Sequence, residues 1–426
     1  MSTHDGGPFR TSSAQQQLIR LHQLSGAGSC AYNESIAWRM ARGVEHDVLR
    51  IAVDHLERRH SAFRTRFSAD GSLQFVAATP AQQWEIRGVS GSLGQALEAL
   101  GEARRFPFNL ETGPLHRWFW FDLEQDGYLL GLIMHHSVVD GQSFAIVQRE
   151  LPVCYAAARA GEFPQLKPAS SYVDHVETQL KRLAAGELSV AEAYWNEVID
   201  LRLPHPLPPQ ERVLAAGPRS YRGREVHAEL TREDWASLQQ TCRSEDISAA
   251  VGLLGSFSLA LSTWSACNAF IVGVGVSSRP LPATDTMVGY AVNPLPIGLS
   301  VEWSESMAAL WKRTRTALLR AVAHRNIPIA AVMERRGEAG AAHRVVFDYF
   351  DGFDQSPNGA LALEMHPVPS PFAAFDLRLA LTPLRGGLRV TCQYDADRYA
   401  EATIAGFCDT FLYFVRRALH GTSHPL

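Results

Sequence analysis

The run His135-His136-Ser137-Val138-Val139-Asp140-Gly141 stands between an apolar segment, 128–134, and a long helical pattern, 141–158. Adjacent residues of a strand point to opposite faces of a sheet, so only one of the two histidines can face a given cavity. We therefore predict no metal site at His135 and His136. Two histidines, an acidic residue and a glycine at these four positions would arise by chance in roughly one chain in two hundred of this composition.

His136 is the residue that we predict to be catalytic. An imidazole can accept or direct a proton near neutral pH, as required when an amine or hydroxyl attacks an acyl group. For His135, Asp140 and Gly141 we expect a structural role, and amides near Gly141 are predicted to help a developing negative charge. The alternative is that both histidines are hydrogen-bonded core residues and that Asp140 only caps the helix.

Helix and strand patterns alternate on both sides of this run. Leu18, Leu21 and Leu24 recur at helical spacing, and strand patterns at 115–123 and 128–134 flank a polar turn. Further helices are predicted at 48–56, 172–200, 248–264, 307–323 and 401–419, and further strands at 63–67, 73–76, 220–228, 269–276, 345–350 and 388–394. The alternation predicts an α/β protein.

The chain is too long for a single hydrophobic core. It has 426 residues, whereas one core stops growing at about 250–300 residues. Pro164, Pro168 and the Pro-rich segment 203–209 interrupt the periodic patterns. We predict an N-terminal lobe that carries the run 135–141, a helical linker and a C-terminal lobe, at 1–171, 172–209 and 210–426 respectively.

The composition excludes several classes of protein. With 40 Lys+Arg against 44 Asp+Glu, the net charge of -4 is too balanced for a protein that grips nucleic acid. The 6 cysteines include no Cys-x-x-Cys pair, which argues against a zinc site or a disulfide framework. No signal peptide is evident, and the uncharged stretch 247–278 reads as a buried helix and strand. We expect a cytoplasmic protein with neither nucleic acid nor membrane as a partner.

Ordered motifs along the chain carry a family resemblance. They are Ser12-Ser13-Ala14-Gln15 before a helix, 59–67 (Arg-His-Ser-Ala-Phe-Arg-Thr-Arg-Phe), 135–141, Tyr172-Val173-Asp174 with Tyr194-Trp195, Ser278-Arg279-Pro280, 288–293 (Val-Gly-Tyr-Ala-Val-Asn), and 324–328 with Phe375-Asp376-Leu377. In this order they resemble the motifs of the condensation domains of nonribosomal peptide synthetases, in the chloramphenicol-acetyltransferase-like superfamily.

The resemblance implies a fold and a set of site residues. It implies two chloramphenicol-acetyltransferase-like lobes in a V arrangement, with a central active-site tunnel that holds His136. Substrates would enter this tunnel from opposite faces. A floor loop near 288–298, which includes Asn293, would lie beneath the tunnel. Arg279 would pair with Asp140 and order the active-site loop.

The resemblance also implies a reaction. An acyl or aminoacyl thioester, carried on the phosphopantetheine of a peptidyl or acyl carrier protein, would be joined to an amine or alcohol nucleophile. The product is an amide or an ester in natural-product biosynthesis, and no tightly bound cofactor is expected. Because a thioester is already activated, positioning of the two reactants is the enzyme's main contribution. Met1 and the tail 424–426 lead us to expect a freestanding enzyme.

Three departures from the family pattern bear on the substrate. Ser61 stands where the family usually has Glu, Gly298 stands where Arg is common, and 175–179 lacks the usual aromatic pair. Three alternatives stay open: an O- or N-acyltransferase that uses coenzyme A thioesters, a non-catalytic domain that recruits partner proteins, and an epimerase. An intact His136 argues against the recruitment domain, and the start at 12–15 argues against the epimerase.

Overall fold

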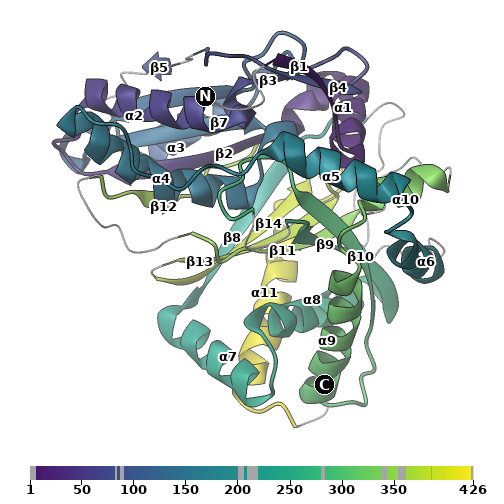
Figure 1. The fold of residues 1–426 in the computed structure, drawn as a ribbon. Coiled ribbons are helices and arrows are strands. Elements are labelled where there is room, and N and C mark those ends of the chain that lie inside the picture. The colour runs from purple at the N-terminus through teal and green to yellow at the C-terminus, as the bar shows by residue number, and fades with distance from the viewer. Residues whose placement is uncertain are drawn as a thin grey trace. The chain divides into compact units, whose positions relative to one another are not determined.

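The computed structural model describes residues 6–81, 84–86, 91–199, 206–208, 219–279, 284–336, 343–353, 361–384, 386–423 and 426. Helices and strands alternate along this part of the chain, which confirms the predicted α/β class (Figure 1). Pro280, the tail residues 424–425 and the Pro-rich segment 203–209, except for 206–208, lie outside the described residues.

Two compact units make up the chain. Unit 1 comprises Met1–Ala185, Arg279–Ala291 and Gly352–Pro371, and unit 2 comprises Gly186–Ser278, Val292–Asp351 and Phe372–Leu426. The predicted lobe boundaries at 171 and 209 do not coincide with these units. The reason is that two later segments return to unit 1, one through Arg279, which binds Asp140, and one through a short strand, Glu364–His366, which pairs with Ala37–Arg39.

Unit 1 is built on two sheets. The larger sheet has the order β12-β2-β7-β6-β5, and the smaller has the order β1-β4-β3. The elements are β1 (Gly6–Arg10), α1 (Ser13–Ser25), η1 (Gly26–Tyr32), β2 (Asn33–Met40), α2 (His46–Arg59), η2 (Ser61–Arg64), β3 (Thr65–Phe67), β4 (Leu73–Val76), β5 (Trp84–Ile86), α3 (Leu93–Ala103), β6 (His116–Asp122), η3 (Glu124–Asp126), β7 (Tyr128–His135), η4 (His136–Val138), α4 (Gly141–Ala160), α5 (Tyr172–Ala184) and β12 (Glu364–His366).

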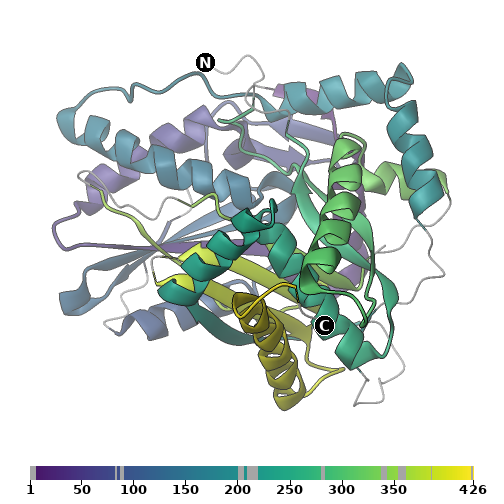
Figure 2. The same ribbon diagram turned by 90° about the horizontal axis from the view of Figure 1, so that it is seen from below.

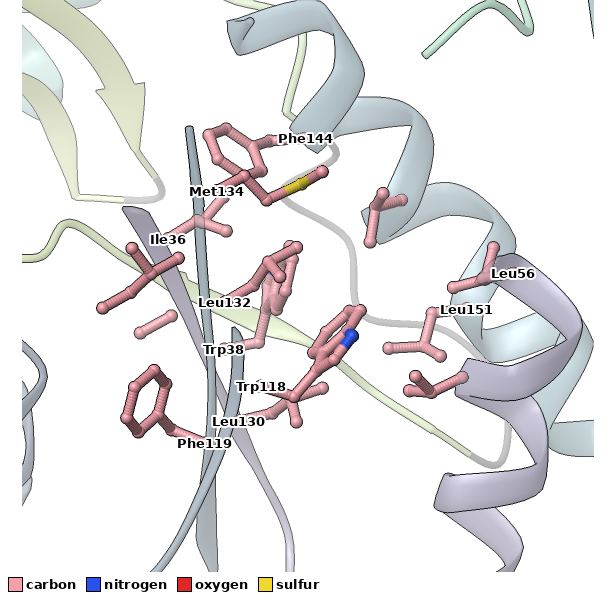
Figure 3. Close-up of a cluster of buried hydrophobic side chains, with 14 of the residues drawn as sticks. Ile36, Trp38, Leu56, Trp118, Phe119, Leu130, Leu132, Met134, Phe144 and Leu151 are labelled. Carbon is pink, nitrogen blue, oxygen red and sulfur yellow. The ribbon is translucent and has the colours of Figure 1, made fainter. Parts of the chain in front are cut away.

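The core of unit 1 follows from the two-residue period of its strands. Leu56 of α2 and Leu151 of α4 face the sheet, and Trp118 of β6 points toward these helices (Figure 3). The next residue, Phe119, points to the opposite side (Figure 3). On that side Leu100 of α3 packs closely against Gly131 of β7. A Cβ atom at position 131 would lie only 2.6 Å from the Leu100 side chain, so the glycine permits this close approach. Both faces of β7 are therefore buried, and its end is held in place.

Unit 2 is built on one six-stranded sheet with the order β10-β9-β11-β13-β14-β8. Helices α7, α8, α9 and α11 gather on one face of it (Figures 1 and 2). The elements are α6 (Ser189–Val198), β8 (Gly223–Thr231), α7 (Arg232–Ser244), α8 (Ala249–Ser265), β9 (Ala269–Ser277), β10 (Val292–Ser300), α9 (Met307–Ala323), α10 (Ile329–Arg335), β11 (Val345–Tyr349), β13 (Leu377–Leu384), β14 (Gly387–Asp395) and α11 (Glu401–Leu419).

The uncharged stretch 247–278 forms α8 and β9, which confirms the predicted helix and strand. The Ser248 side chain caps α8 by accepting from the Val251 amide. In the part of the chain that the structure describes, no single helix is long and apolar enough to cross a membrane. Only α7 and α8 taken together reach that length and composition, and they meet at a bend of 101°.

Two predictions about the linker and the floor loop are corrected. The predicted linker 172–209 is divided, since α5 belongs to unit 1 and α6 to unit 2. From Val292 onward the predicted floor loop is a strand, β10, which pairs with β9 over its whole length. The sequence did not predict this strand, because Pro294 and Pro296 lie within it and proline is unusual inside a strand. They are tolerated because β10 is an edge strand, whose outer side needs no N–H for a neighbouring strand.

Candidate active site

The predicted active-site run lies where β7 ends and α4 begins. His135 is the last residue of β7 and is fully buried. His136 opens the short turn η4, and its side chain is only partly buried, whereas residues 137–140 are buried. Of the two histidines, His136 is therefore the one that keeps some solvent exposure.

The ring of His136 is held in one tautomer by its own turn. Its Nδ1 atom lies 2.8 Å from the carbonyl oxygen of Val139. A carbonyl oxygen can only accept, so Nδ1 carries the proton and donates it. In the neutral ring the lone pair is then on Nε2, and no described residue is hydrogen-bonded to Nε2. The ring of Tyr290 stands edge-on beside His136, with centroids 4.8 Å apart. The lone pair on Nε2 of His136 is therefore unused by the described residues, and the ring of Tyr290 lies beside it.

His135 turns the other way, into the protein. The backbone N–H of Ser137 donates to its Nδ1 at 3.3 Å, and the Ser137 hydroxyl lies 2.7 Å from the same atom. Its Nε2 lies 3.1 Å from Nδ1 of His22 in α1. Burial, as the largest cause, lowers the pKa of His135 well below its usual value. These contacts support the structural role predicted for His135.

Asp140 and Arg279 form a buried ion pair, as predicted. Arg279 donates Nη1–H to Oδ2 at 2.6 Å and Nη2–H to Oδ1 at 2.8 Å. Oδ1 also accepts from the Ser143 amide and hydroxyl, at 2.9 and 2.7 Å, and Oδ2 accepts from the Ala291 amide at 3.0 Å. The pair is confirmed, and the carboxylate is satisfied by five hydrogen bonds.

The ion pair decides the charge of the Asp140 carboxylate. Burial alone would raise the pKa of Asp140, but the charge of Arg279 and the hydrogen bonds from Arg279 and Ser143 outweigh burial. The pKa of Asp140 is therefore below its usual value, and the carboxylate is ionised at neutral pH. An ionised carboxylate with these bonds anchors the Arg279 side chain and the first turn of α4.

Arg279 also holds the segment that carries Tyr290. Its Nη2 atom donates to the carbonyl oxygens of Met287 and Gly289, at 3.2 and 3.1 Å. The Tyr172 hydroxyl donates to the Tyr290 carbonyl at 2.7 Å. A Cβ atom at position 289 would lie 2.2 Å from the Tyr172 ring, so this position requires glycine. Tyr172, Arg279 and Gly289 thus cooperate to place Tyr290 beside His136.

Gly141 is the first residue of α4, so this helix begins where it was predicted to begin. We expected free amides at this helix N-terminus to stabilise negative charge. The Ser143 amide instead donates to the Asp140 carboxylate, which caps the helix. The Ser143 amide is therefore used within the protein, and the role of other amides near Gly141 stays a prediction. Asp140 thus caps α4, the contact that the alternative interpretation named, and it also pairs with Arg279.

Asn293 is a residue of β10 and belongs to unit 2, whereas the other predicted site residues belong to unit 1. Its side-chain amide donates to the carbonyl oxygens of Arg325 and Ile327, at 3.0 and 2.7 Å, and its Oδ1 accepts from the Ile329 amide at 3.0 Å. These three bonds fasten the segment before α10 to the edge strand. They occupy the polar atoms of the side chain, so Asn293 acts on the backbone of unit 2.

Two residues of α1 contribute to the site in a way that motif matching did not assign. Ser12 and Gln15 form a reciprocal capping box at the start of the helix, and the Gln15 amide also donates to the Ser137 carbonyl at 3.0 Å. His22, seven residues further on, contacts His135. Seven residues are two helical turns, so both side chains lie on one face of α1. The seven-residue spacing of Gln15 and His22 is the feature of the sequence that could have identified both as neighbours of the active-site run.

Among the residues that the structure describes, no three His, Cys, Asp or Glu side chains are grouped so that they could hold a metal ion.

Comparisons with known proteins agree on one family. The family model of the condensation domain matches residues 9–426. The chain is similar to the phosphinothricin tripeptide synthetase PhsC of Streptomyces viridochromogenes, with 30% identity over 424 residues that cover 94% of this chain. The chain spans only 38% of the length of that curated relative.

Solved structures share the fold. The condensation domain from the monacolin K polyketide synthase MokA superposes with a TM-score of 0.86 and 18% identity, covering 99% of this chain and 100% of the other. The X-domain in its complex with OxyB from teicoplanin biosynthesis superposes with a TM-score of 0.79 and 19% identity, covering 97% of this chain and 93% of the other. Since the family model spans nearly the whole sequence and the fold agrees, this chain belongs to the condensation domain family.

Proposed function

We propose that this protein is a condensation enzyme that joins an acyl or aminoacyl thioester, carried on the phosphopantetheine of a carrier protein, to an amine or alcohol nucleophile. The observation that carries the proposal is the ring of His136. Its Nδ1–H is bonded to the Val139 carbonyl, so the lone pair of the neutral ring is on Nε2, which has no partner among the described residues. A recruitment domain would have no need of such a group.

The reaction can be written with all atoms in place. The amine or hydroxyl attacks the thioester carbonyl, and Nε2 of His136 accepts the proton that the nucleophile loses. The tetrahedral intermediate then collapses, the C–S bond breaks, and the proton passes from Nε2 to the sulfur of the phosphopantetheine thiol. The products are an amide or ester and the free thiol. His136 returns to its starting tautomer, because Nδ1–H stays bonded to Val139 throughout.

The neighbours of His136 support this assignment. The Asp140–Arg279 pair holds both the turn that contains His136 and the segment that contains Tyr290. Neither charge is free to take part in proton transfer, since the carboxylate accepts five hydrogen bonds. The enzyme's contribution is therefore to position the two reactants and to accept one proton. Positioning of this kind can contribute about 7–11 kcal/mol to lowering a barrier.

The donor can be tested directly. One acyl group is supplied on a separate carrier protein, on coenzyme A and on N-acetylcysteamine, each with the same panel of amines and alcohols, and kcat/KM is compared. We expect strong preference for the carrier, because its surface adds recognition that a small thioester lacks. Equal use of coenzyme A would favour the acyltransferase. Tight carrier binding without turnover, in wild type as in His136→Ala, would favour a recruitment domain.

The use of a separately supplied carrier also tests whether the enzyme acts in trans. We propose that it does, as a freestanding condensation enzyme. Turnover should then rise with carrier concentration and saturate. The matched control is a carrier whose phosphopantetheine bears no acyl group, which should compete with the loaded carrier and give no product.

A further inference from the structure

We propose that His22 is a positioning residue that holds the active-site turn through His135. The inference deepens the proposed function and rests on it, because it assigns to α1 the task of fixing the residue that precedes His136. His22 lies outside the run 135–141, and only the folded chain brings it there. A continuous set of hydrogen bonds runs from α1 to the turn.

The hydrogen-bond directions in this set are determined by one fixed donor. The Ser137 backbone N–H points at Nδ1 of His135 and can only donate, so Nδ1 carries no proton. The proton of the neutral His135 ring is then on Nε2, which donates to Nδ1 of His22 at 3.1 Å. His22 therefore acts as the acceptor. The two rings stand edge to face, with centroids 4.9 Å apart and an interplanar angle of 81°, which suits this bond.

Without His22, the Nε2–H of His135 would be a buried donor without a partner. His135 is fully buried, and its other ring nitrogen is already used by Ser137. The ring cannot flip to help, because a flip would remove the acceptor from the Ser137 amide. A buried unpaired donor favours alternative side-chain positions. Since His135 and Ser137 flank His136 in the chain, movement of either displaces its ring.

A second contact from the same helix face supports the assignment. Gln15 donates to the Ser137 carbonyl at 3.0 Å, so α1 contacts both the strand end and the turn. Burial lowers the pKa of His22, as burial first of all does for His135, and this favours the neutral rings that the bond requires. The two contacts from Gln15 and His22 keep His136 in the position set by its Val139 bond.

The first test needs no substrate and reads the protonation of His135 in the wild-type protein. Protein labelled with 15N in its histidine rings is studied by NMR, and the His135 signal is assigned by its loss in His135→Asn. We expect the ring proton of His135 on Nε2, shifted downfield and slow to exchange. A His135 proton on Nδ1 would overturn the proposal. This readout remains valid if the protein turns over no thioester, an outcome that would reject the proposed function alone.

The second test uses two substitutions of matched size. Asn at position 22 can place its Oδ1 close to the place of the imidazole Nδ1, whereas Leu offers no acceptor. We expect kcat of His22→Leu to fall about tenfold, the effect of one lost hydrogen bond, with KM for both substrates changed less than about twofold. His22→Asn should retain kcat within about threefold and keep the slowly exchanging His135 proton.

The control lies on the same helix. Leu24 is 76% exposed, so Leu24→Ala should leave kcat and the His135 signal unchanged. Thermal midpoints are measured for each variant. A loss of kcat in His22→Leu that His22→Asn does not recover, in proteins of equal thermal midpoint, would refute positioning by the hydrogen bond. Unchanged kcat in His22→Leu would refute it as well.

Discussion

Removal of one partner from the Asp140–Arg279 pair should destabilise unit 1 before it affects the chemistry. The sharpest substitution is Asp140→Asn, which keeps the size of the side chain and removes its charge. It leaves the Arg279 guanidinium, 2% exposed, without a counter-ion. A buried charge that has lost its partner costs about 3–5 kcal/mol. Arg279→Met should cost a similar amount, because it also leaves the carbonyls of Met287 and Gly289 without their donor.

The expected size follows from the contacts. Two charge-assisted hydrogen bonds, at 2.6 and 2.8 Å, join the partners, and each contributes about 1.5–3 kcal/mol. In the double variant neither charge is left alone, so its loss should be smaller than the sum of the two single losses. We expect a coupling of about 2–3 kcal/mol from the double-mutant cycle. For a folding unit of roughly 200 residues, each kcal/mol lowers Tm by about 2–4 °C.

The assay is urea unfolding of the wild type, the two single variants and the double variant. The control is the same cycle on Asp54 and Arg58, whose closest contact is also 2.6 Å but whose side chains are 25% and 55% exposed. That pair should show a coupling of only about 0.3–0.5 kcal/mol. Equal coupling in both cycles would refute the argument that burial makes the Asp140 pair strong. Loss of kcat in Asp140→Asn at full stability would show instead that the carboxylate serves the reaction.

The other predictions concern catalysis, pH and the core. His136→Ala should lower kcat by about a hundred- to ten-thousand-fold with Tm unchanged, since the ring is only partly buried; near wild-type turnover by a folded variant would exclude His136 as the base. Burial lowers the pKa of His60, and it lowers the pKa of His175 to about 4. In the unfolded chain these histidines have their ordinary pKa of about 6.5, so they become protonated at a higher pH than in the folded protein. The free energy of unfolding should therefore decrease as pH falls from about 6.5 toward 4. A flat profile over this interval would contradict the shifts. Glu57 is fully buried, and its carboxylate accepts hydrogen bonds from His116 at 2.8 Å and from the Trp118 indole at 2.9 Å. Glu57→Ala should lower the free energy of unfolding, measured with urea, by about 3–5 kcal/mol, and Glu57→Gln should lower it less. Equal losses of free energy in the two variants would show that the charge of Glu57 adds nothing to stability.

Sequence patterns were sufficient for the local structure around the active site. The end of β7 and the start of α4 were predicted, and a cap at Asp140 was named as an alternative, because strand alternation, helical spacing and capping depend on neighbours within a few residues. The prediction of a single outward-facing histidine followed from the same two-residue period. The strands β2 and β13 were not predicted. In β2 the buried and partly exposed residues do not alternate regularly, because its burial depends on partners that are distant in the sequence. In β13 they do alternate from Leu377 to Thr382, so this strand was missed although the sequence carried the signal.

The sequence by itself determined the α/β class, the place of His136 at a strand end and, through motif resemblance, the partnership of Asp140 with Arg279. Only the tertiary structure decided which nitrogen of His136 is free, that His22 supports His135, and that residues 279–291 belong to unit 1. The physical reason is separation along the chain. His22 lies 113 residues from His135, and Arg279 lies 139 residues from Asp140. Hydrogen bonds over such distances leave no periodicity in the sequence and form only when the packed core brings their donors and acceptors together.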